Sequence, residues 1–334
     1  MRWTKCSRSN AKLARLGAVL VFLSFLSLPA SSQDVIRSQS NVVLIPALVK
    51  DADGGTVYGL RAKDFVIEDD GVEQEVRLDE TPEGQPISLV VAVQTGRRAY
   101  HEFPRMQGLK SMLSPLFELG TSRIALVEFD SQVKTAMRFS QDEALFDSHL
   151  NAIESGDGGA AILDAVGYSV DLLKKEPDDR ERVLLLISET RDHGSKAKIE
   201  DLVASIGQTN TLMYALAFSP ALSNILDTGR GNNKEEEQGG INVLDLMYRT
   251  AQAFRKNVPS AITSMTGGEY QLFATKKKFD VRMNDFTNHL HSRYLLSISP
   301  RSPKPGLHQL QVRLRAGTDT VLARTSYWAE GPKQ

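Results

Sequence analysis

Polar side chains of opposite charge follow two apolar stretches of the chain. After the first stretch, residues 87–93, come an amide, a glycine and two guanidinium groups: Gln94, Gly96, Arg97 and Arg98. After the second, residues 182–188, come the carboxylates Glu189 and Asp192. The carboxyl ends of parallel strands meet at one edge of a sheet, where open α/β folds bind their ligands. Because arginine binds carboxylates at two points, the pattern predicts either an internal ion pair or a site for a partner's carboxylate.

Other titratable groups give less specific patterns. Four acidic residues fall in two loops and could form a cation site, although such clusters are most often solvated: Glu154, Asp157, Glu189 and Asp192. His289 and His291 lie two residues apart on an expected helix, which points their rings to different faces. The sequence has no G-x-S-x-G nucleophile motif, no Walker loop and no G-x-G-x-x-G segment after a strand. These observations predict that the protein is not an enzyme.

The elements expected to position these residues alternate between buried strands and helices. Apolar or alternating runs predict strands over 87–93, 122–130, 132–140, 182–189, 211–219 and 267–273. Helical spacing of apolar residues predicts helices over 103–116, 162–173, 199–206, 244–266 and 279–291. This order is typical of a doubly wound, mostly parallel sheet. We therefore expect a Rossmann-like α/β domain over 86–290.

The two ends of the chain have β texture. Residues 34–82 contain alternating strands, with a turn at Asp70-Gly71 and with Pro46 as the mark of an edge strand. Residues 293–330 alternate in the same way, and neither piece has enough strands to be stable alone. We expect the two pieces to form one β-sandwich. The polar, glycine-rich segment 227–240 is interpreted as a mobile surface insertion, with a specific binding loop as the alternative.

The N-terminus predicts export. Five of the 40 basic residues and none of the 41 acidic residues precede Asp34, and an apolar run from Leu16 to Leu28 follows them. This run is shorter than the roughly 20 residues of a membrane span, so residues 1–32 are predicted to be a signal peptide of a secreted or periplasmic protein. An uncleaved membrane anchor is the alternative. Cys6 is the only cysteine, so the mature chain has no thiol for disulfides, metal or catalysis.

Beyond residue 33 the chain carries 35 basic and 41 acidic residues, a net charge of −6. Its hydrophobic content of 41% is that of a globular protein rather than a disordered one. A mildly acidic chain of this kind gives no reason to expect nucleic acid as a partner.

Six segments of the chain match a known family in content and order. They are "VYGLRAKDFVIEDDGVEQEV", "ISLVVAVQTGRR", "GDGGAAILDAV", "RVLLLISETRDHGS", "TGGEYQLF" and "RYLLSISP". Together they resemble a von Willebrand factor A domain flanked by β-strands and, more closely, the VWFA-related family described from acidobacteria. The resemblance covers nearly all of residues 41–330. It implies a bacterial, non-enzymatic protein-binding module.

The resemblance also implies where a metal would bind. A domains that bind a divalent cation use an Asp-x-Ser-x-Ser motif, a Thr and a late Asp, which are hard oxygen ligands, and leave one position for a partner's carboxylate. In this chain those positions fall on Gln94, Gly96, Arg98, Ala160 and Glu189. An arginine about 4 Å from a divalent cation would be repelled by about 8 kcal/mol at an effective dielectric constant near 20. We expect a degenerate metal-ion-dependent adhesion site and no cofactor.

Three roles are open for Arg97 and Arg98. One guanidinium takes the place of the cation and pairs with Glu189, or both are solvated, or one accepts a partner's carboxylate. The function predicted overall is adhesion or assembly: an exported module that binds a protein partner, without metal, through loops 94–102, 155–161 and 189–195. Contact with a membrane is expected only if the N-terminal segment is uncleaved. The alternatives are a scaffold subunit of an envelope complex, which uses the sandwich or the insertion, and an envelope hydrolase.

Overall fold

The computed structural model describes residues 42–79, 85–118, 120–218, 243–300 and 304–330. All described residues belong to one compact unit, Asn41–Gln334. The predicted signal peptide and the 227–240 insertion lie outside the described residues, and the division into domains remains a prediction.

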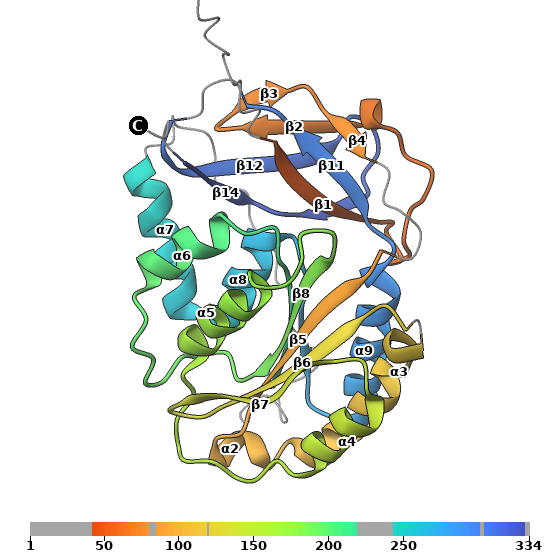
Figure 1. Ribbon diagram of the computed structural model, residues 1–334. Helices are drawn as coiled ribbons and strands as arrows, with labels where there is room; N and C mark the ends of the chain where they lie inside the picture. The colour runs from red at the N-terminus through yellow and green to blue at the C-terminus, as the bar shows by residue number, and fades with distance from the viewer. Residues whose placement is uncertain (1–41, 80–84, 119, 219–242, 301–303, 331–334) are drawn as a thin grey trace, which may run out of the picture. The chain divides into compact units, whose positions relative to one another are not determined.

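A six-stranded sheet forms the centre of the α/β part (Figure 1). From edge to edge it contains β10 (Tyr270–Phe273), β9 (Leu212–Phe218), β8 (Glu181–Ser188), β5 (Ile87–Gln94), β6 (Arg123–Phe129) and β7 (Val133–Ser140). Neighbouring strands are parallel, except that β7 runs antiparallel to β6. The chain builds from β5 to β6 and β7, and then returns to the other side of β5 for β8. The switch point, where open α/β sheets bind ligands, therefore lies between β5 and β8.

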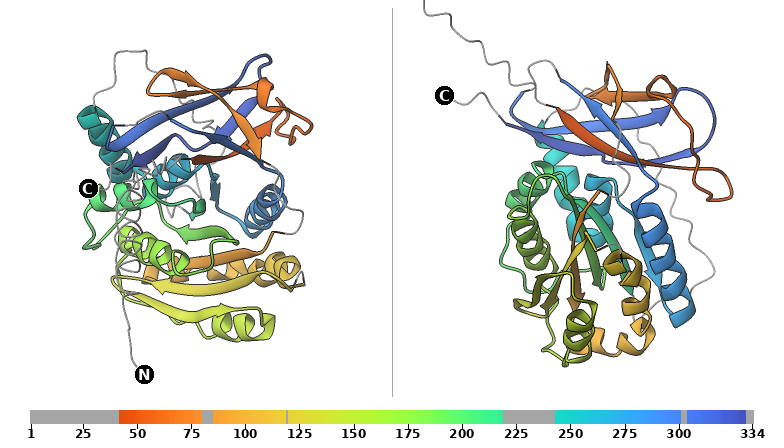
Figure 2. Two further views of the ribbon diagram at one scale, coloured as in Figure 1. Left: turned by 45° about the horizontal axis from the view of Figure 1, so that its top comes forward. Right: turned by 45° about the vertical axis from the view of Figure 1, so that its right-hand side comes forward.

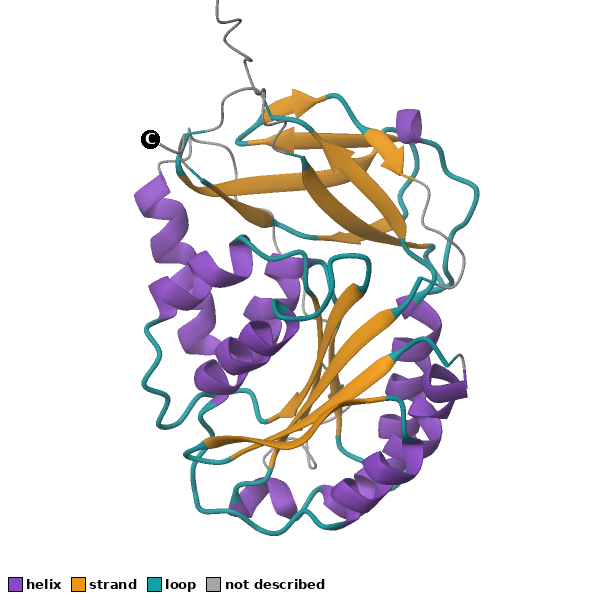
Figure 3. Ribbon diagram, in the orientation of Figure 1, coloured by secondary structure: helices purple, strands orange, loops and turns teal. Residues whose placement is uncertain are grey.

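Helices cover both faces of this sheet (Figure 3), which explains why every residue of β5 is buried. One face packs against α3 (Leu109–Glu118), α4 (Glu143–Asn151), α9 (Lys276–Leu290) and the short η3 (Phe103–Met106). The other packs against α5 (Ile162–Leu173), α6 (Ile199–Gly207), α7 (Val243–Lys256) and α8 (Val258–Thr266). The short α2 (Arg97–Tyr100) follows β5 directly. The doubly wound, mostly parallel sheet predicted from the sequence is confirmed.

The helix expected over 244–266 is two helices, α7 and α8. Asn257 separates them because its side-chain oxygen accepts a hydrogen bond from the backbone N–H of Ser260 at 3.1 Å and caps α8. Pro259 lies in the first turn of α8, where its missing N–H costs no hydrogen bond. Helix α4 was not expected from the sequence, because Phe146 is its only buried residue and leaves little apolar periodicity.

Two four-stranded antiparallel sheets combine strands from the two ends of the described chain (Figure 2). The first contains β13 (Thr320–Ala323), β1 (Val43–Lys50), β11 (Tyr294–Ile298) and β4 (Arg77–Asp79). The second contains β14 (Ser326–Ala329), β12 (Gly306–Leu314), β2 (Phe65–Asp69) and β3 (Val72–Gln74), and the short η2 (Ala62–Asp64) precedes β2. Their inner faces share one apolar cluster. The predicted sandwich of N- and C-terminal strands is confirmed.

Two details of the sandwich differ from the sequence prediction. Pro46 does not mark an edge strand, since β1 pairs with both β11 and β13. The ladder to β13 begins only at Ala47, so the proline lies one residue outside it. The β texture near the C-terminus forms two strands in different sheets, β13 and β14, because the chain crosses between the sheets at Arg324 and Thr325.

This crossing is tied to the α/β part by buried polar contacts. The buried guanidinium of Arg324 donates to the carbonyl oxygens of Leu44 at 3.2 Å, Gly207 at 3.2 Å and Ser326 at 3.0 Å. These carbonyls belong to β1, α6 and β14. Burial lowers the pKa of Arg324 to about 10, so the group is still charged at neutral pH.

A second buried group, Glu269, joins β1 to helix α9. Its carboxylate lies 2.5 Å from the ammonium of Lys50 and 2.7 Å from Nδ1 of His289. Burial alone would raise the pKa of Glu269, but the hydrogen bonds from His289 and Lys50 outweigh it and lower the pKa to about 2. The carboxylate is therefore ionised over the whole neutral range.

Candidate functional site

The end of β5 and the residue after β8 are joined by a reciprocal pair of hydrogen bonds. The side-chain Nε2 of Gln94 donates to Oε1 of Glu189 at 3.0 Å, and the backbone N–H of Glu189 donates to Oε1 of Gln94 at 2.9 Å. Both side chains are buried. This pair lies at the switch point between β5 and β8. The side-chain oxygen of Gln94 and one of its two amide N–H groups are therefore hydrogen-bonded inside the protein.

Gly96 is enclosed by the loop that contains residues 156–159. A Cβ added to Gly96 would lie 2.4 Å from the carbonyl oxygen of Gly159, far inside van der Waals contact. The backbone N–H of Arg97 donates to the carbonyl of Asp157 at 2.6 Å. Loop 94–102 and loop 155–161 are therefore in direct backbone contact. A serine does not fit at position 96 without movement of this loop.

Ala160 and Asp192 connect the second loop to the third. Ala160 forms a two-bond backbone bridge with His193, at 3.0 Å and 2.8 Å. The carboxylate of Asp192 accepts from the backbone N–H of Leu163 at 3.0 Å and from the hydroxyl of Ser195 at 2.5 Å. The N-cap residue of α5, Ala161, has no side chain that could cap the helix. Asp192 thus caps α5 from a neighbouring loop.

The acidic residues at this edge do not converge on one point. Asp157 accepts from the backbone N–H groups of Ser131 at 3.1 Å and Gly159 at 2.7 Å, and the Ser131 hydroxyl also donates to it. These hydrogen bonds hold the pKa of Asp157 below its usual value. Among the described residues, no three His, Cys, Asp or Glu ligand atoms at this edge lie within 4.8 Å of one another. The displaced cation site considered from the sequence is therefore not formed by the described groups.

Arg97 and Arg98 open the short helix α2 and are exposed. Ala99, the next residue of the helix, is fully buried in the apolar cluster on one face of the sheet. In the described part of the chain neither arginine forms an ion pair with a carboxylate within 4.0 Å. The contacts of Glu189 are Gln94 and, at 3.9 Å, His193. The structure therefore brings Gln94 and Glu189 together and leaves both guanidinium groups outside that pair.

The side chains here fit a divalent cation poorly. Mg²⁺ and Ca²⁺ require six or more oxygen ligands. The amide oxygen of Gln94 is already an acceptor, Gly96 has no room for a hydroxyl side chain, and Ala160 has no side-chain oxygen. The three loops 94–102, 155–161 and 189–195, hereafter the carboxyl edge, are instead held together by their own hydrogen bonds.

A groove of about 500 Å³ lies beside α2. Its lining includes the aromatic rings of Tyr100 and Phe103, whose centroids are 5.2 Å apart, and the ion pair Lys110–Asp147. Sequence patterns did not indicate this groove, because its walls come from α2, η3, α3 and α4, and α4 was not predicted. It extends the exposed surface next to Arg97.

Comparison with known families bears on this part of the chain. Residues 102–239 match the von Willebrand factor type A domain. This match falls on the α/β part of the chain, which is called the A domain below. Such domains are typically protein-interaction modules. No curated protein matches the sequence.

Solved structures similar to this chain include three proteins of different origin. The conserved hypothetical protein BatB from Bacteroides thetaiotaomicron is 12% identical, with a TM-score of 0.40 over 61% of this chain and 98% of that chain. Proximal thread matrix protein 1 from the mussel byssus is 11% identical, with a TM-score of 0.43; the match covers 64% of this chain and 48% of that chain. The vWF domain of the type V pili tip protein Mfa5 from Porphyromonas gingivalis is 16% identical, with a TM-score of 0.28; the match covers 32% of this chain and 38% of that chain.

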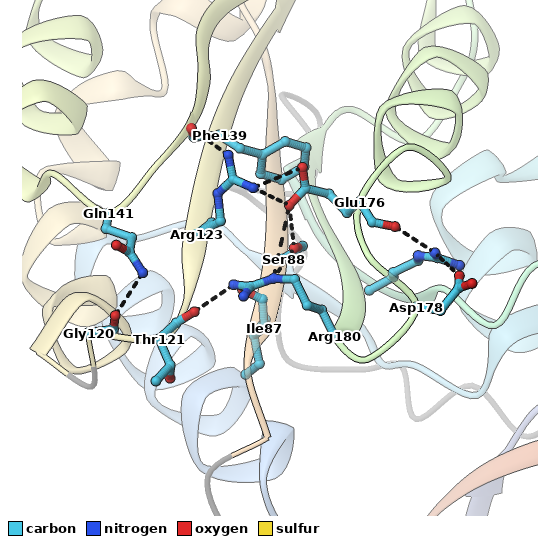
Figure 4. Close-up of polar contacts among 11 residues, drawn as sticks. Ile87, Ser88, Gly120, Thr121, Arg123, Phe139, Gln141, Glu176, Asp178 and Arg180 are labelled. Atoms are coloured by element: carbon cyan, nitrogen blue, oxygen red, sulfur yellow. Dashed lines mark hydrogen bonds and ion pairs between the residues drawn. The ribbon is translucent and has the colours of Figure 1, made fainter.

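The opposite end of the A domain sheet carries a separate polar network (Figure 4). The carboxylate of Glu176 accepts from Arg123 at 3.1 Å and from the hydroxyl of Ser88 at 2.8 Å. Arg180 donates to that hydroxyl at 2.8 Å and to the carbonyl of Ile87 at 2.8 Å. Because each charged group has partners, this network fastens the starts of β5 and β6 to the segment before β8. Among the described residues, no helix of this A domain or its flanks is long and apolar enough to cross a membrane.

Proposed function

We propose that this chain is an exported, non-enzymatic protein-binding module that recognises an acidic segment of a partner through Arg97 and Arg98, without a divalent cation. The observation that carries the proposal is which side chains of the carboxyl edge are bonded internally and which are exposed. Gln94 and Glu189, at two of the positions where the family resemblance places metal ligands, are hydrogen-bonded to each other, whereas the adjacent guanidinium groups of Arg97 and Arg98 are exposed.

The exposed arginines stand on a rigid base. The N–H of Arg97 is bound to the carbonyl of Asp157, and the N–H of Tyr100 donates to the carbonyl of Gly96 at 3.0 Å. A fixed backbone lowers the entropy that a binding surface loses on association. Guanidinium groups bind carboxylates at two points, which would replace the bond that a metal makes to a partner's carboxylate in metal-dependent A domains. The groove beside α2 gives the partner's neighbouring side chains a place to pack.

Export rests on the N-terminal sequence alone, and the absence of enzymatic activity rests on the missing catalytic motifs. Export is tested by expressing the full chain in a bacterial host and separating periplasm, membrane and medium. A mature form in the periplasm or the medium that begins near residue 33 supports it. Retention of the unprocessed chain in the membrane fraction supports the anchored alternative.

The binding proposal is tested by affinity capture from envelope extract of the source cells, in the presence of EDTA. The variant Arg97→Ala/Arg98→Ala is expected to retain less than a tenth of the partner, since loss of a charge-assisted hydrogen bond costs about 1.5–3 kcal/mol. The matched control is Lys174→Ala/Lys175→Ala, which removes two charges from an exposed site at the end of α5. Equal capture by both variants, or capture that requires added Mg²⁺, would overturn the proposal.

Metal independence has its own test. Calorimetric titration of the protein with Mg²⁺ is expected to show no saturable micromolar binding at the carboxyl edge. Glu189 is the one carboxylate at a former ligand position, so Glu189→Gln is the appropriate comparison. Saturable Mg²⁺ binding that disappears in Glu189→Gln would show that the edge still holds a cation.

A further inference from the structure

A second cluster of potential ligands lies in the β-sandwich, away from the A domain motifs. Asp69 ends β2, Asp70 begins the turn to β3, and His308 lies on β12. The ring Nδ1 of His308 is 3.2 Å from Oδ1 of Asp69 and 2.9 Å from Oδ2 of Asp70. Among the described residues, this is the group of three His, Cys, Asp or Glu side chains whose ligand atoms all lie within 4.8 Å. Asp69 and His308 are buried, and Asp70 is exposed.

The hydrogen bonds of His308 leave its Nδ1 facing only acceptors. The other ring nitrogen, Nε2, lies 2.6 Å from the carbonyl oxygen of Lys304. A carbonyl oxygen accepts only, so Nε2 carries a hydrogen, and in a neutral ring Nδ1 then carries the lone pair. A lone pair and two ionised carboxylates at this distance repel one another unless a proton or a cation lies among them. Within the described part of the chain no lysine or arginine forms an ion pair with Asp69 or Asp70.

Each of the three side chains also forms a hydrogen bond through an atom that does not take part in the cluster. His308 is oriented by the carbonyl of Lys304, and the free oxygen of Asp69 accepts from the hydroxyl of Tyr327 at 3.0 Å. The second oxygen of Asp70 accepts from the backbone N–H of Gln309 at 2.9 Å. Metal ligands in proteins are oriented in this way by outer hydrogen bonds, which fix the ring and carboxylate positions. These outer bonds leave one nitrogen and two oxygens that lie within 4.8 Å of one another.

We propose that Asp69, Asp70 and His308 bind one divalent transition-metal ion, with Zn²⁺ as the ion that suits one imidazole and two carboxylates. Ligand atoms that lie about 2.0–2.2 Å from one tetrahedral zinc ion are about 3.3–3.6 Å apart. The ring nitrogen is 3.2 Å and 2.9 Å from the two carboxylate oxygens here, so bound zinc would widen the spacing to Asp70 by about 0.5 Å. The exposed side of Asp70 leaves a fourth position open to solvent. The ligand set differs from the all-oxygen set of an A domain, and the site is independent of the proposed function.

The ion would tie together parts of the sandwich that are far apart in the sequence. The hairpin β2–β3 supplies two ligands, and β12 supplies the third after 238 or 239 residues. An ion that binds only the folded chain stabilises it in proportion to the logarithm of its concentration over its dissociation constant. We therefore expect Zn²⁺ to raise the melting temperature of the whole protein.

The test uses the full protein, stripped of metal with a chelator and desalted. Calorimetric titration with Zn²⁺ is expected to show one saturable site per chain, and Co²⁺ is expected to give visible absorption bands of a bound ion that Zn²⁺ displaces. Asp70→Asn is the main variant, since asparagine tolerates the left-handed backbone of this position, where φ is 49°. It should weaken Zn²⁺ binding at least tenfold and remove the rise in melting temperature. His308→Gln should abolish the Co²⁺ spectrum.

Asp53→Asn is the matched control, because Asp53 is an exposed aspartate that also precedes a glycine in a turn of the same sandwich. It should bind Zn²⁺ as the unchanged protein does. No saturable Zn²⁺ binding by the metal-free protein would overturn the proposal and leave a protonated His308 as the charge between the carboxylates. Unchanged binding in Asp70→Asn would overturn it as well. Capture of a partner by Asp70→Asn reports on the carboxyl edge alone, so the two proposals fail separately.

Discussion

The amide of Gln94 satisfies a donor and an acceptor of Glu189 at the switch point of the sheet. A carboxylate at the same position could accept a hydrogen bond but could not donate one. A carboxylate here would therefore lose the hydrogen bond that Gln94 donates to Glu189. Gly96 adds a steric condition, because the backbone of Gly159 fills the space of a side chain.

Gln94→Asp is expected to destabilise the protein although it introduces a ligand type that metal-binding A domains use. The new carboxylate would face Glu189 in a buried site without a donor, which costs about 1–3 kcal/mol. Urea unfolding at neutral pH measures the loss, with and without Mg²⁺. An increase in stability on adding Mg²⁺ would show instead that one carboxylate is enough to restore the metal site.

Gly96→Ser is expected to cost about 1–3 kcal/mol, since the added Cβ overlaps the carbonyl of Gly159. Gly158→Ser is the control in the facing loop, where an added Cβ meets nothing within 4 Å. Melting temperatures of the two variants give the comparison. Equal melting temperatures would contradict the close packing of these two loops.

At the scale of elements, one loop of the carboxyl edge caps a helix of the A domain. The N-terminus of α5 is capped by Asp192, which belongs to the loop after β8 rather than to the segment before the helix. The same helix is tied further to that loop by Asp164, whose carboxylate accepts from the N–H of Ala197 at 2.7 Å. The third loop therefore stabilises α5 as well as shaping the edge.

Asp192→Ala should lower the free energy of unfolding by about 0.5–2 kcal/mol, the usual cost of losing a helix cap. Asp171→Ala, at an exposed position of the same helix, should change it by less than about 0.5 kcal/mol. Chemical denaturation of both variants provides the measurement. A smaller loss for Asp192→Ala than for Asp171→Ala would show that the cap contributes nothing.

Sequence patterns predicted a strand well where both of its faces are buried, and a helix well where buried apolar residues recur with helical spacing. The strand β5 and the helix α5 were predicted because apolar residues dominate them. Helix α4 has one buried residue, and the break between β13 and β14 depends on which sheet each strand joins. The bond between Gln94 and Glu189 depends on β8 lying next to β5, and sequence order alone does not specify that neighbour.

The sandwich cluster was harder to anticipate. Asp69 and His308 are 239 residues apart, and no local spacing relates them. The turn at Asp70-Gly71 was predicted from its residue types, but its role as a ligand position follows only from the pairing of β2 with β12. Which residues of two distant strands face each other depends on the register of strand pairing. That register cannot be predicted from the type of any single residue.

At the scale of the whole molecule, buried charges join the sandwich strands to the A domain. Glu269 accepts from Lys50 of β1 and His289 of α9, and Arg324 binds carbonyls of β14 and α6. Breaking a buried pair costs more than breaking an exposed one, since the remaining charge stays desolvated. The two parts are therefore expected to unfold together, in a single calorimetric transition. Two well-separated transitions would contradict this expectation.

Glu269→Gln should destabilise the protein at neutral pH and flatten its acid dependence. The pKa of Glu269 is lowered from its ordinary value of 4.5 to about 2 in the folded state, so its contribution is present above pH 4.5 and is lost as the pH falls through about 2. The shift corresponds to roughly 3 kcal/mol. Urea unfolding from neutral pH to about pH 2 measures it, with the exposed Glu200→Gln as control. An unchanged acid dependence in Glu269→Gln would contradict the assignment.

The β-sandwich combines strands from both ends of the chain, and this has a consequence for protein synthesis. β1 leaves the ribosome some 250 residues before its partner β11, which at 5–20 residues per second is a delay on the order of tens of seconds. During that time the growing chain carries unpaired, apolar strand edges, which are prone to join other chains. Folding of this region is therefore completed from the C-terminus, and a chain cut before residue 293 should aggregate even though its A domain sequence is intact.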